Sequence, residues 1–178
     1  MPNHNQNQAK HHTSHPKAKP IYTRNIENVE AGTRLSAMAL YDKDENEYLL
    51  LDNKETKLVL TYPTLNNKHV LNEIQKIEKV LEEIPSLYCY LVTNEPVYTQ
   101  TRLLANTQLN RFKVLSDFKN REYAKQTGTY IYELGALVKS IFVLDYAGRV
   151  LYNRYYEDLN VPINTDALLS DLKNVLEP

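Results

Sequence analysis

Two spacings of apolar residues alternate along this chain. Short apolar runs bounded by polar turns are typical of strands, whereas apolar residues at every third or fourth position are typical of amphipathic helices. Together they predict the element order β-β-β-α-β-α-β-α-β-β-α. The expected elements are a hairpin around the acidic turn 42–47, a strand at about 57–62, a helix at 68–84, a strand at 86–94, a helix at 97–106, a strand at 111–118, a helix at 120–128, a hairpin at 139–157 and a helix at 164–178.

The stretch 68–84 shows the helical spacing most clearly. Its apolar residues fall on one stripe, and Pro85 is expected to end the helix because proline cannot continue one. The stripe consists of Val70, Leu71, Ile74, Ile77, Val80, Leu81 and Ile84.

The element order determines the expected fold class. Strand–helix–strand units require parallel strands, and the late hairpin adds antiparallel ones. We therefore expect an α/β protein whose central mixed sheet carries helices on both faces.

The composition indicates one domain behind a polar tail. The chain has 178 residues, 42% of them apolar, which is enough for a single core. Residues 1–20 contain no apolar residue larger than Ala after Met1, which predicts a disordered tail rich in His, Asn, Gln, Lys and Pro ahead of a domain at 21–178. The tail holds four of the five histidines. A polar tail that picks up metal only loosely is favoured over a metal site, because no carboxylate or cysteine completes a ligand set.

Charge and cysteine content narrow the range of partners. A net charge of -1 gives no electrostatic driving force toward nucleic acid or a membrane surface. No apolar run reaches the ~18–20 residues of a membrane span, and the first 20 residues lack the apolar centre of a signal peptide. A single cysteine excludes an intramolecular disulfide and fits a reducing compartment. We expect a cytoplasmic protein without a metal or cofactor.

The segment LVLTYPTLNNKHVLNEI, residues 58–74, places a polar turn between a strand and the long helix. Free backbone N–H groups and the helix dipole converge at such a helix start, where they can hold a reactive anion. The turn contains no good nucleophile. The sequence thus predicts a place suited to chemistry without the group that would perform it.

The order of elements is that of a thioredoxin fold, and the second half of the chain shows a more specific likeness. The stretches VLSDFKNREYAKQTGTYI and SIFVLDYAGRVLYNRYYEDLNVPINTDALLSDL resemble the C-terminal half of bacterial thiol peroxidases, the atypical two-cysteine peroxiredoxins. The likeness extends back through YCYLVTNEPVYTQTRLLA and VLTYP to VEAGTRLSAMAL, and it covers about residues 29–176. It implies a thioredoxin-like fold of the peroxiredoxin type.

The resemblance also implies where the family's chemistry would lie. Its members carry Pro-x-x-x-Thr-x-x-Cys at the turn into the first long helix, a distant Arg and a second, resolving Cys. The thiolate attacks the peroxide while Thr and Arg hold its oxygens. Only Pro63 matches; the other positions hold Asn67 for Thr, Val70 for the peroxidatic Cys, Lys139 for Arg and Leu104 for the resolving Cys. Without a nucleophile the covalent step is lost.

The remaining reactive residues favour ordinary structural roles. Cys89, the only thiol, lies in a predicted core strand with no His, Lys or Arg within five residues, so an inert buried side chain is favoured. His69 is interpreted as a partly exposed polar residue rather than a base. Lys68 and Lys139 are interpreted as solvated side chains rather than an anion site.

The sequence therefore predicts a catalytically inactive thiol peroxidase homologue, a pseudo-peroxiredoxin, that acts through protein binding. It would do so as a homodimer or with an unknown protein partner. Two alternatives stay open. One is a thiol-dependent peroxidase or redox sensor that uses Cys89 alone. The other is an anion- or metal-binding module that uses the helix start or the histidine tail.

Overall fold

The structure is a computed structural model that describes residues 22–177. The strands are β1 (Ala39–Tyr41), β2 (Glu47–Leu49), β3 (Lys57–Thr61), β4 (Tyr88–Thr93), β5 (Phe112–Ser116), β6 (Tyr130–Ile131), β7 (Ala136–Leu137), β8 (Lys139–Leu144) and β9 (Val150–Tyr156). The helices are α1 (Lys68–Leu81), α2 (Val97–Leu103), α3 (Glu122–Thr127) and α4 (Thr165–Leu176).

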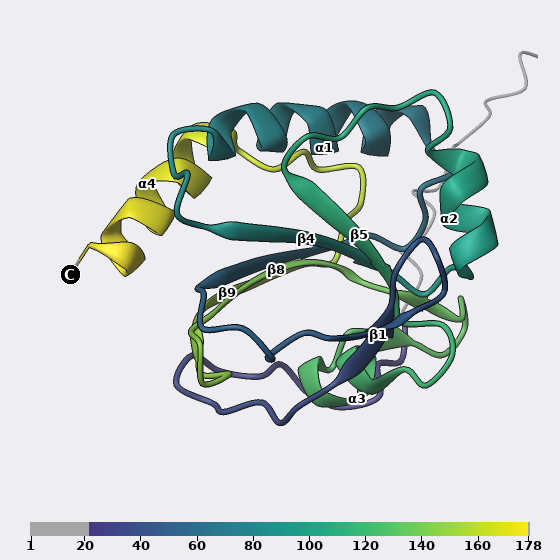
Figure 1. Cartoon of the computed structure of the whole chain (residues 1–178), viewed down its shortest axis with the longest axis horizontal. Coiled ribbons are helices and arrows are strands. Elements are labelled where there is room, and N and C mark those ends of the chain that lie inside the picture. Colours follow the sequence, from purple (N-terminus) through teal and green to yellow (C-terminus); the bar gives the residue numbers. More distant parts are fainter. Residues whose placement is uncertain (1–21, 178) are drawn as a thin grey trace, which may run out of the picture.

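A seven-stranded mixed sheet forms the centre of the molecule, in the order β2-β1-β5-β4-β3-β8-β9. β3, β4 and β5 are parallel, and the remaining pairs are antiparallel. The parallel strands are those joined through α1 and α2, as the strand–helix–strand pattern requires. α1 and α4 cover one face of the sheet and α3 lies on the other (Figure 1). The predicted α/β class and the mixed sheet between helices are confirmed.

The sheet separates two hydrophobic clusters. Leu58 and Leu60 of β3 point into the cluster beneath α1 and α4, whereas Val59 points into the cluster on the α3 side. In the same way Cys89 of β4 faces α1 and Tyr90 faces the opposite side. This alternation is the period-2 geometry of a strand, and burial on both faces explains why the two segments read as continuous apolar runs.

Two predicted details were wrong. α1 ends at Leu81 rather than at residue 84, because the last turn before Pro85 is wound more tightly: the Ile84 N–H donates to the Leu81 carbonyl at 3.0 Å. The sequence reading also placed no element between 128 and 139, where the structure forms the small β6–β7 hairpin around Gly135. Strands of two residues are too short to show an alternating pattern.

The helix expected at 120–128 is present and ends as predicted. Gly128 follows α3 with a left-handed φ of 67°, the usual way for a glycine to end a helix. A Cβ at this position would lie 2.7 Å from the Glu27 carbonyl oxygen, so the close approach also requires glycine. The predicted disordered tail at 1–20 and its histidines lie outside the described residues.

Candidate functional site

The turn between β3 and α1, residues 62–67, lies at the carboxyl end of the parallel strand β3. Asn67 is the N-cap of α1, and its side-chain oxygen accepts the N–H groups of His69 at 2.9 Å and Val70 at 3.3 Å. These two donors are among those that a helix start leaves free for an anion. In this protein they are already occupied by a side chain of the same chain.

A second side chain occupies the middle of the β3–α1 turn. Glu95, which follows β4, accepts the Leu65 N–H at 2.8 Å and the Thr64 hydroxyl at 3.0 Å. The Thr64 oxygen in turn accepts the Asn66 N–H at 3.0 Å. A carboxylate therefore lies where a bound anion would otherwise take backbone hydrogen bonds.

Val70 occupies the first turn of α1 and faces inward. Its side chain is 4% exposed and belongs to the hydrophobic cluster beneath α1 and α4. Leu104, the C-cap residue of α2, is half-buried and packs against the same cluster. The two positions where the family resemblance places cysteines thus both contribute to apolar packing.

Lys139 is buried, not solvated as the sequence suggested. Its side chain is 1% exposed, and its ammonium lies 2.6 Å from a carboxylate oxygen of Glu73 on α1. It also donates to the Val161 carbonyl at 2.9 Å. The Tyr62 hydroxyl donates to the same carboxylate, whose other oxygen accepts the Ile163 N–H at 3.1 Å. A closed network therefore surrounds the cation.

The comparisons with known proteins agree with this architecture. No family model matches the chain. A thiol peroxidase of Clostridium acetobutylicum is 27% identical over 121 residues, which cover 68% of this chain and 74% of the relative. A thiol peroxidase of Staphylococcus haemolyticus is 26% identical over 160 residues, 89% of this chain and 96% of the relative.

Solved structures show the same fold. A peroxiredoxin-like protein from Aquifex aeolicus superposes with a TM-score of 0.77 at 21% identity, covering 86% of this chain and 92% of that one. A thiol peroxidase from Chromobacterium violaceum gives a TM-score of 0.76 at 19% identity, covering 88% and 93%.

The chain is thus similar in sequence to bacterial thiol peroxidases and shares the peroxiredoxin fold.

This thiol peroxidase homologue has one cysteine, Cys89. Cys89 is 4% exposed, which confirms that it is buried. Burial raises the pKa of its thiol, and this outweighs the opposite influence of the Arg111 guanidinium, which approaches the sulfur at 3.8 Å. The Arg111 guanidinium bonds mainly to backbone groups: it donates to the carbonyls of Ile84 and Leu87 at 3.0 and 2.9 Å.

The other candidate residues of this thiol peroxidase homologue are dispersed. His69 and Lys68 are exposed on the first turn of α1, and neither side chain joins the Lys139 network. Within residues 22–177 no three His, Cys, Asp or Glu side chains are grouped to hold a metal ion. No helix in the described part of the chain is long and apolar enough to span a membrane.

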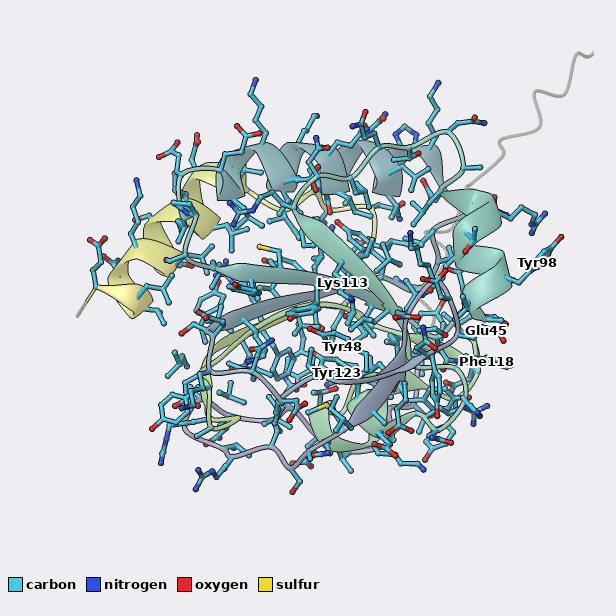
Figure 2. All side chains as sticks on the ribbon, viewed as in Figure 1. Glu45, Tyr48, Tyr98, Lys113, Phe118 and Tyr123 are labelled. Atoms are coloured by element: carbon cyan, nitrogen blue, oxygen red, sulfur yellow. The ribbon has the colours of Figure 1, made fainter. Side chains whose placement is uncertain are left out.

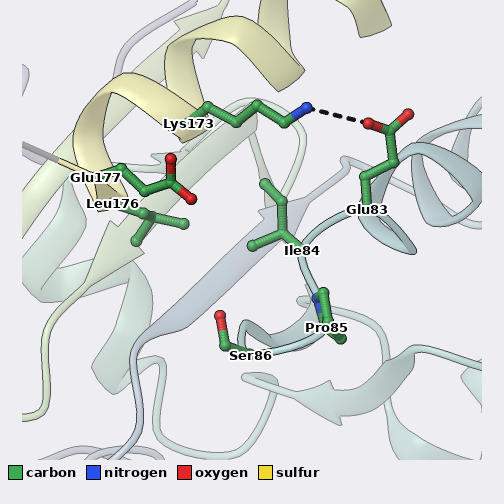
Figure 3. A pocket seen from close by; sticks show the side chains of 7 residues that line it. All are labelled: Glu83, Ile84, Pro85, Ser86, Lys173, Leu176 and Glu177. Carbon is green, nitrogen blue, oxygen red and sulfur yellow. Dashed lines mark hydrogen bonds and ion pairs between the residues drawn. The ribbon is translucent and has the colours of Figure 1, made fainter.

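One hollow of this thiol peroxidase homologue lies away from the β3–α1 turn. A cavity of about 130 Å³ separates the segment after α1 from the end of α4 (Figure 3). Lys173 and Glu83 form an exposed ion pair of 3.1 Å across it. Its other lining residues are Ile84, Pro85, Ser86, Leu176 and Glu177, which include no activated nucleophile.

Sequence reasoning missed two residues of this site in the thiol peroxidase homologue, Glu73 and Glu95, and it missed Arg111 beside Cys89. Glu73 could have been found, because positions 70, 73 and 77 share one helix face and a carboxylate there faces inward. Glu95 follows β4, which is parallel to β3, so the turns after these two strands lie at the same edge of the sheet. Arg111 was hidden because only strand register reveals its position: Cys89 lies opposite Phe112 in the neighbouring strand.

Proposed function

We propose that this chain is a catalytically inactive thiol peroxidase homologue, a pseudo-peroxiredoxin, which acts through protein binding or dimerisation. The observation that carries the proposal is Val70, a buried aliphatic side chain at the position where the resemblance places the peroxidatic cysteine. An aliphatic side chain supplies neither a thiolate nor a proton, so no covalent intermediate can form there.

The surroundings of Val70 support the same proposal. Peroxide cleavage requires donors aimed at the substrate oxygens. The N–H groups of Leu65, His69 and Val70 are instead bonded to side chains of this chain. Lys139, at the proposed arginine position, is held by Glu73 and offers a point charge rather than a two-pronged guanidinium.

Two exposed aromatic side chains on segments near the β3–α1 turn support a binding role. Tyr98 on α2 is 75% exposed and projects away from the ribbon, and Phe118 after β5 is 47% exposed (Figure 2). Tyr98 follows Glu95 in the chain, and Phe118 follows Ser116. The Ser116 hydroxyl donates to the Glu95 carbonyl at 2.6 Å, which brings the two segments together. Tyrosine and phenylalanine are enriched in protein interfaces. We place the proposed homodimer contact on this surface of Tyr98 and Phe118.

Sedimentation equilibrium of the full chain tests the dimer, with Tyr98→Lys as the disrupting variant and Tyr146→Lys as its control. Tyr146 is 65% exposed but lies in the β8–β9 turn. We expect a wild-type dimer whose dissociation constant rises at least about tenfold in Tyr98→Lys, the typical effect of losing an interface anchor. A monomeric wild type, or equal effects of both variants, would contradict the homodimer and leave a different protein as the partner.

A second candidate function uses Cys89. The observation in its favour is the Arg111 guanidinium near the sulfur, since a cation favours thiolate. Burial acts against it. A cytoplasmic location belongs to the main proposal, because a free thiol suits a reducing compartment.

A further inference from the structure

A hollow of about 180 Å³ lies beside α3 and β6, on the face of the sheet opposite α1. It is lined by Asn25, Arg121, Ala124, Lys125, Tyr130 and Tyr132, and we call it the α3 hollow. Ala124 and Tyr130 belong to or pack against the cluster on the α3 side, whereas Val70 belongs to the other cluster. The α3 hollow is therefore separate from the β3–α1 turn, and the proposed function does not use it.

Two cations border the α3 hollow. Arg121 and Lys125 are both exposed, and their separation of four residues puts them on one side of the same helical turn. Neither forms an ion pair with any carboxylate among residues 22–177. Asp117, the carboxylate behind α3, uses its two oxygens on the N–H groups of Tyr123 and Ala124. Like charges at this spacing repel each other, so an anion placed between them would be stabilised.

Aromatic rings form the rest of the wall. The Arg121 guanidinium lies over the Tyr130 ring, 4.8 Å from its centroid. The Tyr132 ring is perpendicular to that of Tyr130, with centroids 5.4 Å apart, and Tyr132 is 59% exposed. A flat ring can stack or pack edge-to-face here. Asn25 holds the shape, because its amide bridges the Ala124 carbonyl and the Tyr130 N–H, both at 3.1 Å.

The backbone at Arg121 supports a use for its side chain. Arg121 has a left-handed φ of 53°, a conformation that is uncommon for a residue with a long side chain. Its N–H donates to the Asp117 carbonyl at 2.9 Å, and its own carbonyl accepts the Lys125 N–H at 3.0 Å. Such conformations gather at binding sites, where the surrounding structure holds them in place.

We propose that the α3 hollow binds a small aromatic anion, a single six-membered ring that carries a phosphate or carboxylate. The size fits, since a cavity of about 150 Å³ is known to hold one benzene ring. The cations supply charge-assisted hydrogen bonds to the acid group, and the tyrosines contact the ring. The N-terminal segment of this same chain, residues 1–21, contains no Asp or Glu, so its side chains cannot be the anion that occupies the hollow.

The test is a titration of the ¹⁵N-labelled full chain with phenyl phosphate, followed by amide chemical shifts. We expect saturable shifts confined to the backbone around the six lining residues, with a dissociation constant on the order of 1 mM or lower. Benzoate should bind at the same place. Benzyl alcohol, which lacks the charge, and inorganic phosphate, which lacks the ring, should each bind at least about tenfold more weakly.

Two variants and one control assign the binding to these side chains. Arg121→Gln should raise the dissociation constant for phenyl phosphate about tenfold or more, because a charge-assisted hydrogen bond is lost. Tyr132→Ala should weaken phenyl phosphate but not inorganic phosphate. Lys119→Gln should change nothing, because Lys119 lies over the Tyr41 ring outside the hollow. The spectra themselves report whether each variant is folded.

Several results would overturn the proposal. These are shifts that do not saturate, shifts centred elsewhere on the molecule, inorganic phosphate binding as tightly as phenyl phosphate, or equal weakening by Lys119→Gln and Arg121→Gln. None of these results bears on whether the protein reduces peroxide, so the proposed function stands or falls separately.

Discussion

The β3–α1 turn and the α3 hollow are both polar regions of one small domain, and their charges are used in opposite ways. In the first, Lys139 is buried against Glu73, and the N–H groups around Val70 are taken by side chains of the same chain. In the second, Arg121 and Lys125 remain exposed beside a hollow lined by tyrosines. Satisfied polar groups in a packed region stabilise a structure, whereas unpaired charges beside a cavity leave binding capacity available.

The largest expected effect concerns the buried pair of the β3–α1 turn. Lys139→Met leaves the Glu73 carboxylate without its cation and should lower the free energy of unfolding by about 3–5 kcal/mol. The control is Lys173→Met, which breaks the exposed Lys173–Glu83 pair and should cost less than about 1 kcal/mol. Urea denaturation measures both. Equal, small losses would show that Lys139 is not held as described and could be free for a ligand.

The next effect is a pH dependence behind the α3 hollow. Burial raises the pKa of Asp117 to about 6 from an ordinary value of 3.8. The folded state therefore holds this proton more tightly than the unfolded chain, and the free energy of unfolding falls as the pH rises from about 4 to 6. Above that range the loss is complete and stays constant.

Urea denaturation at a series of pH values isolates this contribution when wild type is compared with Asp117→Asn, which does not titrate. The difference between their unfolding free energies should change by about 2–3 kcal/mol between pH 4 and pH 7, with wild type losing stability relative to the variant. Parallel curves for the two proteins would show that Asp117 titrates normally and that α3 starts in a more hydrated environment than the structure indicates.

The smallest effect distinguishes a helix cap from a ligand-binding residue. Asn67→Ala removes the acceptor for His69 and Val70 and should cost about 1 kcal/mol. Asn164→Ala at the start of α4 is the matched control, since Asn164 accepts only the Ala167 N–H. Thermal denaturation should show losses of similar size. If Asn67→Ala left the melting temperature unchanged, Asn67 would not be the cap that fills this helix start.

Local patterns predicted the fold well, and long-range pairing explains what they missed. The stripe of apolar residues on α1 and the continuous apolar run in β4 result directly from burial, so these elements could be placed from the sequence. The β6–β7 hairpin was missed because its strands are two residues each. In the site, the resemblance to the Pro-x-x-x-Thr-x-x-Cys motif singled out Asn67 and Val70. The burial of Lys139 could not be inferred, because it depends on Glu73, Tyr62 and Val161 from three other parts of the chain.

The proposed loss of peroxide chemistry is best tested on the unmodified full chain. Hydrogen peroxide is added with thioredoxin, thioredoxin reductase and NADPH, and NADPH oxidation is followed for wild type and Cys89→Ser. Because Val70 carries no thiol and Cys89 is 4% exposed, both proteins should give the rate of the mixture without them. A peroxide-dependent rate that is present in wild type and lost in Cys89→Ser would contradict the inactive homologue and identify Cys89 as a working peroxidatic thiol.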